Sequence, residues 1–315
     1  MELAPVAFFV FNRPELTARV FQRIREARPH KLLLVADGPR ASRSDDAAKC
    51  ATTRDIVSKV DWDCEVLKNF SDVNLGCKRR VSSGLNWVFE HCSEAIVLED
   101  DCLPSRSFFH FCSELLAKFR DDERIMHVGA ANFQPQPRGE ASYYFSRYAH
   151  IWGWATWRRA WKYYDVALAS WPQRKRTNAF ADLVEDQVEL AHWSSIFDRV
   201  HGGKIDTWDY QWQYACWSQR GLSIIPNANL VSNLGFGPDA THTTQTNAIT
   251  QNPLGEIRNL YHSVEVARNM EADRYTFEEH LGGKFLREGA TPLGRARRAL
   301  GRVKRKAIHL LGSGS

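Results

Sequence analysis

The sequence lacks cysteine pairs with C-x-x-C spacing, an internal repeat and a low-complexity linker. Its seven cysteines are odd in number and scattered between Cys50 and Cys216. This pattern argues against a disulfide framework or a structural zinc site, and it favours a reducing compartment. The apolar run within MELAPVAFFVFNRP is too short for a signal peptide or a membrane span. We therefore expect a cytoplasmic protein.

Outside the last residues, the sequence also lacks an excess of either positive or negative charge. The chain has 315 residues and a formal net charge of +5, but residues 291–315 alone contain seven basic residues and no acidic one. Removing these seven from the 42 basic residues leaves 35 against 37 acidic residues. A nucleic-acid-binding domain needs a positive face on its body, so no nucleic-acid partner is expected.

Short apolar runs alternate with amphipathic segments in the first part of the chain. Continuous apolar runs of this length are typical of strands covered on both faces. Their alternation with helices indicates a mainly parallel sheet with right-handed crossovers, so the expected fold class is α/β and Rossmann-like. The predicted strands cover residues 6–11, 31–36, 65–67, 95–98 and 125–129, and helices are predicted after Pro14 and over residues 45–59, 81–89 and 107–119.

The character of the chain changes after about residue 132. It becomes aromatic and loop-rich, with one clear helix predicted over residues 179–200. Six of the eleven tryptophans fall within residues 152–193. Tryptophan clusters form cores, but their faces also stack against sugar rings, and the sequence leaves both interpretations open.

The stretch EAIVLEDDCLP places Glu99, Asp100 and Asp101 directly after a buried apolar run. Like charges repel, and burying one without a partner is costly. The three acids therefore need a cation, a cationic neighbour or open water. A divalent metal ion meets that need, and a solvated turn without a ligand is the alternative.

Two other polar pairs also follow predicted strands: Asn12-Arg13 and Asp37-Gly38. In parallel sheets ligands bind beyond the carboxyl ends of the strands, so these pairs and the acidic triplet are predicted to meet in one crevice. A hard divalent cation bound at Asp101 bridges carboxylate and phosphate oxygens, which makes a nucleoside diphosphate its natural partner. His242, in the glycine-containing stretch NLGFGPDATHTT, is the candidate second metal ligand, and a solvated loop histidine is the alternative.

Two further segments carry charged residues in patterns of interest. In DTWDYQWQYACW, Asp206 and Asp209 lie among aromatic residues that can raise a carboxyl pKa, as a general base requires. The alternative is a helix start, with Asp206 as the cap and Asp209 in the first turn. In NLGCKRRVSSG, Lys78, Arg79 and Arg80 enter a helix, which suits either a bound anion or an exposed basic patch.

The basic tail, residues 291–315, has apolar residues at helical spacing among its seven basic ones. This pattern is typical of a helix that lies on an anionic membrane surface. A disordered, solvated tail is the alternative. We expect peripheral contact with the inner face of the cell membrane.

Taken together, these motifs resemble those of glycosyltransferases of the GT-A fold, in the bacterial family-2-like group. Their order is similar to that of the N-acetylglucosaminyltransferase I family, and the similarity runs from about Val6 to Thr243. The resemblance implies a mainly parallel, GT-A type sheet with an aromatic-rich acceptor lobe. It also implies a nucleotide-sugar-binding half over residues 1–131 and an acceptor half over residues 132–290, with the tail outside both.

The resemblance assigns roles to single residues. Asp37, followed by Gly38, matches the acid that contacts the base, Asp101 matches the acid that binds the metal, and Asp209 matches the catalytic base, although Tyr210 replaces a second acid. The segment HIWGWATWRRAW, residues 150–161, is similar to one that frames the donor sugar, and residues 236–242 resemble a loop that closes over the diphosphate. The remaining nucleotide-sugar contacts implied are Phe11, Asn12, Arg13, Lys78, Arg79, Asp100 and Trp154.

The function implied is that of a metal-dependent, inverting glycosyltransferase. It would use Mn²⁺ or Mg²⁺ and a nucleoside-diphosphate sugar, with a UDP-sugar the expected donor. The acceptor would be a hydroxyl of a glycan or lipid-linked glycan, in surface glycan assembly. The alternatives are a sugar nucleotidyltransferase, which uses a similar sheet and metal, and a non-catalytic carbohydrate-binding protein that uses the tryptophans as a stacking platform.

Overall fold

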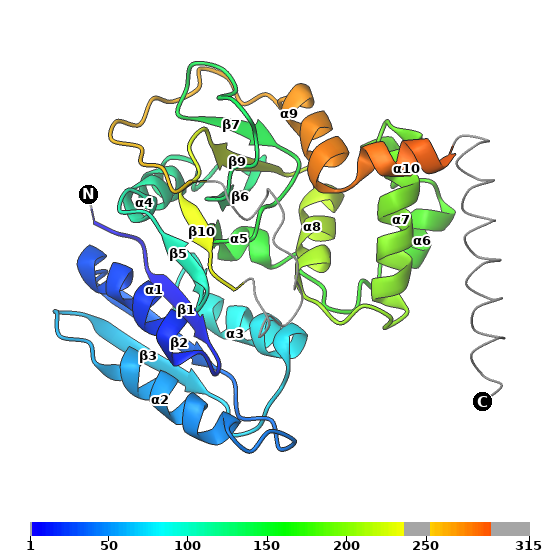
Figure 1. Cartoon of the computed structure of the whole chain (residues 1–315). Coiled ribbons are helices and arrows are strands. Elements are labelled where there is room, and N and C mark those ends of the chain that lie inside the picture. The colour runs from blue at the N-terminus through cyan, green and yellow to red at the C-terminus, as the bar shows by residue number, and fades with distance from the viewer. Residues whose placement is uncertain (1, 236–252, 291–315) are drawn as a thin grey trace, which may run out of the picture.

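A computed structural model describes residues 2–235 and 253–290. Its centre is an eight-stranded sheet with the strand order β3-β2-β1-β4-β8-β6-β9-β7 (Figure 1). Four of the seven neighbouring pairs in it are parallel, so the α/β class with a mainly parallel sheet is confirmed. The strands are β1 (Val6–Val10), β2 (Lys31–Ala36), β3 (Glu65–Phe70), β4 (Glu94–Glu99), β6 (Ile125–Gly129), β7 (Tyr143–Ser146), β8 (Trp154–Trp157) and β9 (Leu222–Pro226).

The order of the first four strands creates a switch point between β1 and β4. From β1 the chain moves outward to β2 and β3, and then returns to place β4 on the other side of β1. In open α/β sheets the crevice at such a point, beyond the carboxyl ends of the strands, is where ligands bind. The acidic triplet begins at the last residue of β4, Glu99, so the fold places it at this crevice.

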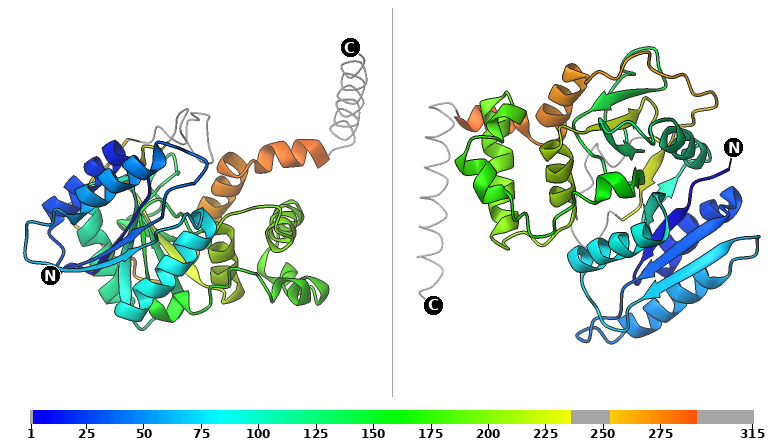
Figure 2. Two further views of the ribbon diagram at one scale, coloured as in Figure 1. Left: turned by 90° about the horizontal axis from the view of Figure 1, so that it is seen from below. Right: turned by 180° about the vertical axis from the view of Figure 1, so that it is seen from behind.

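Helices cover both faces of the sheet because β1 and β2 bury their side chains alternately on the two sides (Figure 2). One hydrophobic core lies under α1, α2 and α4, and the other under α3, α5 and α8. The helices are α1 (Pro14–Ala27), α2 (Asp46–Ser58), α3 (Cys77–His91), α4 (Phe108–Lys118), α5 (Arg158–Trp161), α6 (Trp171–Arg176), α7 (Gln187–His201), α8 (Asp209–Ser218), α9 (Met270–Tyr275) and α10 (Gly283–Ala290), with a 3₁₀ turn η1 (Ala181–Leu183) and a π-helical turn η3 (Thr276–His280).

The second half of the chain contributes more regular structure than the sequence indicated. β7, β8 and β9 join the central sheet, and their residues are buried with no polar-apolar alternation to reveal a strand. The helix predicted over residues 179–200 begins only at Gln187. It begins there because the Asp186 carboxylate accepts hydrogen bonds from the backbone N–H of Val188 and Glu189, at 3.0 and 2.9 Å.

A short second sheet holds the end of the first described segment against the switch point. β5 (Cys102–Pro104) pairs antiparallel with β10 (Val231–Asn233), and Asn233 lies opposite Cys102. The two residues that follow β10, Leu234 and Gly235, therefore lie against Asp101.

Most of the tryptophans form core. Trp154 is 1% exposed and stacks on Trp208, with ring centroids 5.7 Å apart. A third cluster joins α6, α7 and α8 through Trp171, Trp193 and Trp217. Trp152 differs because it is only partly buried.

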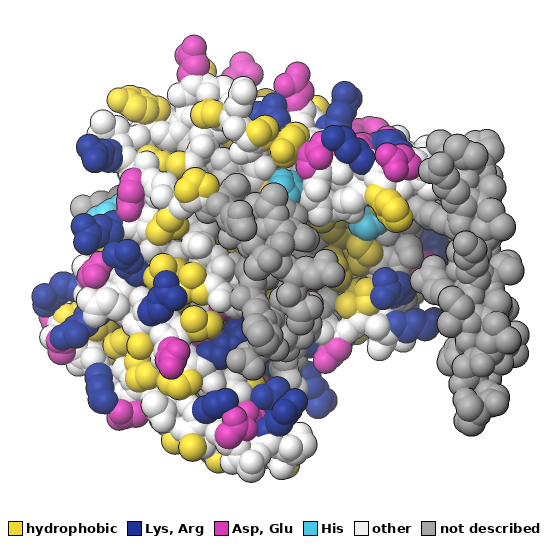
Figure 3. Space-filling model, in the orientation of Figure 1, with side chains coloured by type: hydrophobic (Ala, Val, Ile, Leu, Met, Phe, Trp, Pro, Cys, Tyr) yellow, Lys and Arg dark blue, Asp and Glu magenta, His cyan; other side chains and the backbone are white. Residues whose placement is uncertain are grey.

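Basic and acidic side chains are interspersed on the face shown in Figure 3, as the near-neutral composition predicts. No helix within residues 2–235 and 253–290 has the length and apolar character needed to cross a bilayer. The tail at residues 291–315 lies outside the described residues, so its contact with a membrane stays a prediction.

The Trp154 side chain should be a major source of stability. Replacing it by alanine removes a fully buried ring, and we expect Trp154→Ala to lower the free energy of unfolding by about 3–5 kcal/mol in urea titrations. Tyr163→Ala, at a ring that is 42% exposed, is the control and should change it by less than about 0.5 kcal/mol. Equal losses in the two variants would contradict the core assignment.

Candidate nucleotide-sugar site

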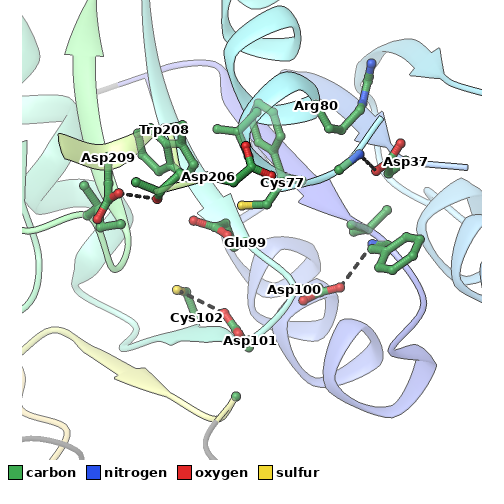
Figure 4. Close-up of a pocket in the computed structure, with 18 of the residues that line it drawn as sticks. Asp37, Cys77, Arg80, Glu99, Asp100, Asp101, Cys102, Asp206, Trp208 and Asp209 are labelled. Carbon is green, nitrogen blue, oxygen red and sulfur yellow. Dashed lines mark hydrogen bonds between the residues drawn. The ribbon is translucent and has the colours of Figure 1, made fainter. Parts of the chain in front are cut away.

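A cavity of about 840 Å³ lies beyond the carboxyl ends of β1, β2 and β4 (Figure 4). The sequence predicted that polar residues at these three strand ends converge, and the structure brings Arg13, Asp37 and the acidic triplet into its wall. Its volume suits a nucleotide with a sugar attached. The charged residues that line it are Arg13, Asp37, Arg40, Arg80, Glu99, Asp100, Asp101, Lys204, Asp206 and Asp209.

Arg13 joins the two strands that meet at the switch point. It follows β1, and its Nη1 donates to Asp101 Oδ2 at 2.8 Å and to Asp100 Oδ1 at 3.4 Å. The backbone N–H of Phe11 donates to Asp100 Oδ2 at 3.1 Å. Asp100 therefore holds the end of β1, while Asp101 carries the stronger ion pair.

The side chain of the third acid, Glu99, has no hydrogen-bond or ion-pair partner within the part of the chain that the structure describes. Burial, together with the charges of Asp101 and Asp100, raises the pKa of Glu99 to about 8. Burial and the Asp101 charge likewise raise the pKa of Asp100 to about 7. Among the described residues one arginine contacts this turn, and a bound cation would lower the cost of ionising its carboxyl groups.

Asp101 is also fixed from the other side by the chain after β10. The backbone N–H of Leu234 donates to the carbonyl oxygen of Asp101 at 2.7 Å. A Cβ on Gly235 would overlap the Asp101 carboxylate, so only glycine allows this approach.

The acidic turn supplies carboxylates of the kind that a phosphate-bound divalent cation uses. No three His, Cys, Asp or Glu side chains of the described residues are grouped as a metal cage. Mg²⁺ commonly uses one or two carboxylates, with phosphate oxygens and water as its other ligands. Glu99 and Asp101 supply two such carboxylates in the cavity wall. His242, the predicted second metal ligand, lies outside the described residues.

Asp37, the predicted base contact, supports the loop before α3. Oδ1 accepts from the backbone N–H groups of Gly38 and Leu75 at 2.9 and 2.8 Å. Oδ2 accepts from Gly76 N and Asn74 Nδ2, both at 3.0 Å. These four bonds use the acceptor capacity of the carboxylate, so a nucleobase would have to displace one of them. A Cβ on Gly38 would overlap the Val73 backbone, which explains the glycine.

Two residues that the sequence analysis missed hold the predicted Phe11-Asn12 segment. Arg40 Nε donates to Asp46 Oδ2 at 2.6 Å, and Asn12 Nδ2 donates to Asp46 Oδ1 at 2.7 Å. The Arg40 guanidinium lies 5.2 Å from the centre of the Phe11 ring, a cation–π contact. Hydrogen bonding to Arg40 holds the pKa of Asp46 well below its usual range. The sequence signal for this group is weak because the residues lie apart in the chain.

In the basic run at the start of α3, the residue that lines the cavity differs from the predicted nucleotide contacts, Lys78 and Arg79. Arg80 lines the cavity and is 7% exposed, whereas Lys78 and Arg79 are absent from its wall. Arg80 Nη2 donates to the carbonyl and side-chain oxygens of Asn69, both at 2.7 Å. Burial lowers the pKa of Arg80. The helical turn explains the difference, because residues next to one another in sequence point in different directions.

The opposite wall is formed by residues 204–210. Asp206 and Asp209 both line the cavity, and Thr207 donates a hydrogen bond to Asp209. Asp209 is the first residue of α8, and no side chain caps that helix at Trp208. Trp154, predicted to contact the donor sugar, lies in the core and is absent from the cavity lining; Trp152 is present there instead.

No protein-family model and no curated protein matches this chain. Solved structures do match. A UDP-glucose pyrophosphorylase complexed with UDP-glucose is 10% identical over 71% of this chain and 90% of its own, with a TM-score of 0.38. An apo UDP-glucose pyrophosphorylase is 8% identical over the same shares, also with a TM-score of 0.38. A 4-diphosphocytidyl-2C-methyl-D-erythritol synthase from Anaerococcus prevotii is 12% identical over 53% and 78%, with a TM-score of 0.35.

These matches correct the predicted function. They are nucleotidyltransferases, which contradicts the predicted inverting glycosyltransferase and agrees better with its alternative. The role predicted for Asp209, as base toward an acceptor hydroxyl, belonged to that function; the structure places Asp209 in the cavity wall. The sequence motifs did not separate the two classes, because an acidic turn after a strand serves phosphate and metal binding in either. At these identities the likeness itself concerns the fold alone.

The raised carboxyl pKa values give a pH dependence of stability. A carboxyl whose pKa is raised on folding stabilises the protein fully below its unfolded pKa, and this contribution is lost as pH rises through the folded pKa. Without divalent cations, raising the pH from about 6.5 to 8 should therefore lower the unfolding free energy of the wild type by about 1–2 kcal/mol relative to Glu99→Gln.

Denaturant titrations at several pH values, in chelator, measure this difference. Glu265→Gln, which removes an exposed carboxyl, is the control for the loss of one charge. Parallel pH profiles for the wild type and Glu99→Gln would show that folding does not raise the pKa of Glu99.

Proposed function

We propose that this chain is a metal-dependent sugar nucleotidyltransferase, which transfers a nucleoside monophosphate from a nucleoside triphosphate to a sugar phosphate. The observation that carries the proposal is the juxtaposition, in one cavity at the switch point, of the acidic turn Glu99–Asp101 with four basic side chains. Phosphate groups with a bound cation need both kinds of partner. The cavity supplies both, from the ends of β1 and β4, from α3 and from the loops that carry Arg40 and Lys204.

The basic residues are spread around the cavity. Arg13 lies beside the acidic turn, Arg40 beyond Phe11, Arg80 on α3 and Lys204 on the opposite wall. Fixed positive groups stabilise the charge that builds up on phosphate oxygens during transfer, and they need no reorganisation when the reaction occurs. Arg13 is held by two carboxylates, so its position is set before substrate binds.

Glu99 and Asp101 would hold the divalent cation, which when bound neutralises phosphate charge and orients the leaving group. Asp100 holds the backbone of Phe11, and thereby the turn that carries Arg13. Gly235 closes on Asp101 and limits the directions from which a phosphate can approach it.

The reaction needs positioning more than proton transfer. An oxygen of the sugar phosphate, already anionic, attacks the α-phosphorus; a new P–O bond forms, the bond to the bridging oxygen of the β-phosphate breaks, and pyrophosphate leaves with the electron pair. Because the nucleophile carries no proton, no general base is required, and alignment supplies much of the rate. The identity of the base, with uridine expected from the sequence, forms part of the proposal.

Formation and loss of pyrophosphate measure this activity directly. With Mg²⁺ or Mn²⁺, purified protein should release pyrophosphate from a nucleoside triphosphate only when a sugar 1-phosphate is present, and the reverse reaction should consume pyrophosphate and a nucleoside-diphosphate sugar. Panels of uridine, thymidine and guanosine nucleotides should be tested with several sugar phosphates. Chelator should abolish both directions, and Asp101→Asn should lower the rate about 10²-fold or more.

Release of a nucleoside diphosphate from a nucleotide sugar without any need for pyrophosphate would contradict the proposal. If the protein binds a nucleotide in a metal-dependent way but shows no activity, the binding site would be supported and the proposed reaction would be contradicted. Circular dichroism of Asp101→Asn would establish that the variant is folded.

Arg80 and Arg79 provide a matched pair for the phosphate contacts. Arg80 lines the cavity and Arg79 is exposed outside it, so Arg80→Leu should weaken nucleotide binding about tenfold or more, and Arg79→Leu should leave it nearly unchanged. Calorimetry with a nucleoside diphosphate and Mg²⁺ measures both affinities. Equal effects would indicate a diffuse electrostatic attraction instead of a defined contact.

A further inference from the structure

A second cavity, of about 140 Å³, adjoins the nucleotide-sugar site. Ile151, Asp209 and Tyr210 line both cavities, so the two meet across these residues. Its other walls come from α7, from α8, which Figure 1 shows beside the central sheet, and from η3. It is large enough for several water molecules and small compared with a nucleotide.

The two cavities differ in charge. The larger one is lined by Arg13, Arg40, Arg80 and Lys204, and the smaller has no lysine or arginine among the described residues of its wall. Asp209 is the charged side chain that the smaller cavity presents. A phosphate or carboxylate placed there would meet a like charge without a compensating cation. The smaller cavity therefore suits an uncharged group.

Two histidines in this wall do not change that conclusion. Burial lowers the pKa of His150 to about 3 and also lowers that of His280, so burial favours the neutral form of both imidazoles. His280 Nε2 lies 2.9 Å from the carbonyl oxygen of Phe133, and that nitrogen must carry the proton. Its Nδ1 is therefore an acceptor, and it has no partner among the described residues.

The rest of the wall combines aromatic rings with hydrogen-bonding groups. Trp193 and Tyr210 meet edge to face, with ring centroids 5.9 Å apart, and Phe133 lies 4.8 Å from His280. The buried Nε1 of Trp193 and Nε2 of His150 have no hydrogen-bond partner in the described chain. Buried polar atoms of this kind are usually satisfied. The aromatic rings and the Asp209 carboxylate of this wall match a ring that has apolar faces and hydroxyl groups.

We infer that the smaller cavity binds the ring of a neutral sugar, whose phosphates lie in the larger cavity, and that Asp209 at the junction selects against acidic sugars. This inference rests on the proposed function for the nucleotide sugar itself. It assigns Asp209 to substrate selection. The carboxylate accepts hydrogen bonds from sugar hydroxyls and repels a carboxylate on the ring.

Binding of matched nucleotide sugars tests the selection without any need for turnover. With Mg²⁺ present, calorimetry should be run with UDP, UDP-glucose and UDP-glucuronic acid, and with the corresponding GDP-mannose and GDP-mannuronic acid set if guanosine is the base bound. The nucleotide carrying the neutral sugar should bind at least about tenfold more tightly than the nucleotide carrying the corresponding acidic sugar. Asp209→Asn should remove most of that ratio. Asp206→Asn, a matched change in the larger cavity alone, should preserve it.

His280→Leu tests the place of the sugar, because His280 lines only the smaller cavity. This substitution should weaken binding of the neutral nucleotide sugar about tenfold and leave the affinity for the nucleoside diphosphate unchanged. Circular dichroism would establish that the variant is folded. Equal binding of neutral and acidic sugars by the wild type, or retention of the ratio in Asp209→Asn, would overturn the inference. Failure to bind any nucleotide would instead overturn the proposed function.

Discussion

The placement of three carboxyl groups against one arginine is the constraint on which the site depends. Arg13 closes the gap between β1 and β4, and it cannot neutralise Glu99, Asp100 and Asp101 together. The sheet geometry forces this crowding, because the two strands are parallel neighbours and both turns emerge at the same edge. Among the described residues, the acidic turn therefore has fewer basic contacts than carboxyl groups, and the proposed divalent cation would supply the positive charge that ionising all three requires.

The main features around this edge could be predicted from sequence because they are local. Apolar runs predicted β1, β2 and β4, and the polar residues after them had to lie at strand ends. The identities of the contacts could not be predicted in the same way. Arg40 and Asp46 meet Asn12 only through the fold, and the choice of Arg80 over its two neighbours depends on the rotation of α3.

The aromatic second half shows the same limit. Its tryptophans suggested either a core or a sugar platform, and in the structure most of them form core while a few also line the two cavities. Trp154, Trp171 and Trp217 are core, whereas Trp193 belongs to the core and also borders the smaller cavity. Composition alone does not distinguish these roles, because a buried ring and a ring beside a ligand differ only in what packs against one face.

The position of β8 has a consequence for how the protein folds. β8 lies between β4 and β6, so the strand that carries the acidic turn gains its second neighbour only from the other half of the chain. Contacts so distant in sequence are slow to form, since a large loop must close first. Until they form, β4 is an exposed edge that other chains can pair with. Aggregation during synthesis is thus a hazard created by the same strand order that places the site at the centre of the sheet.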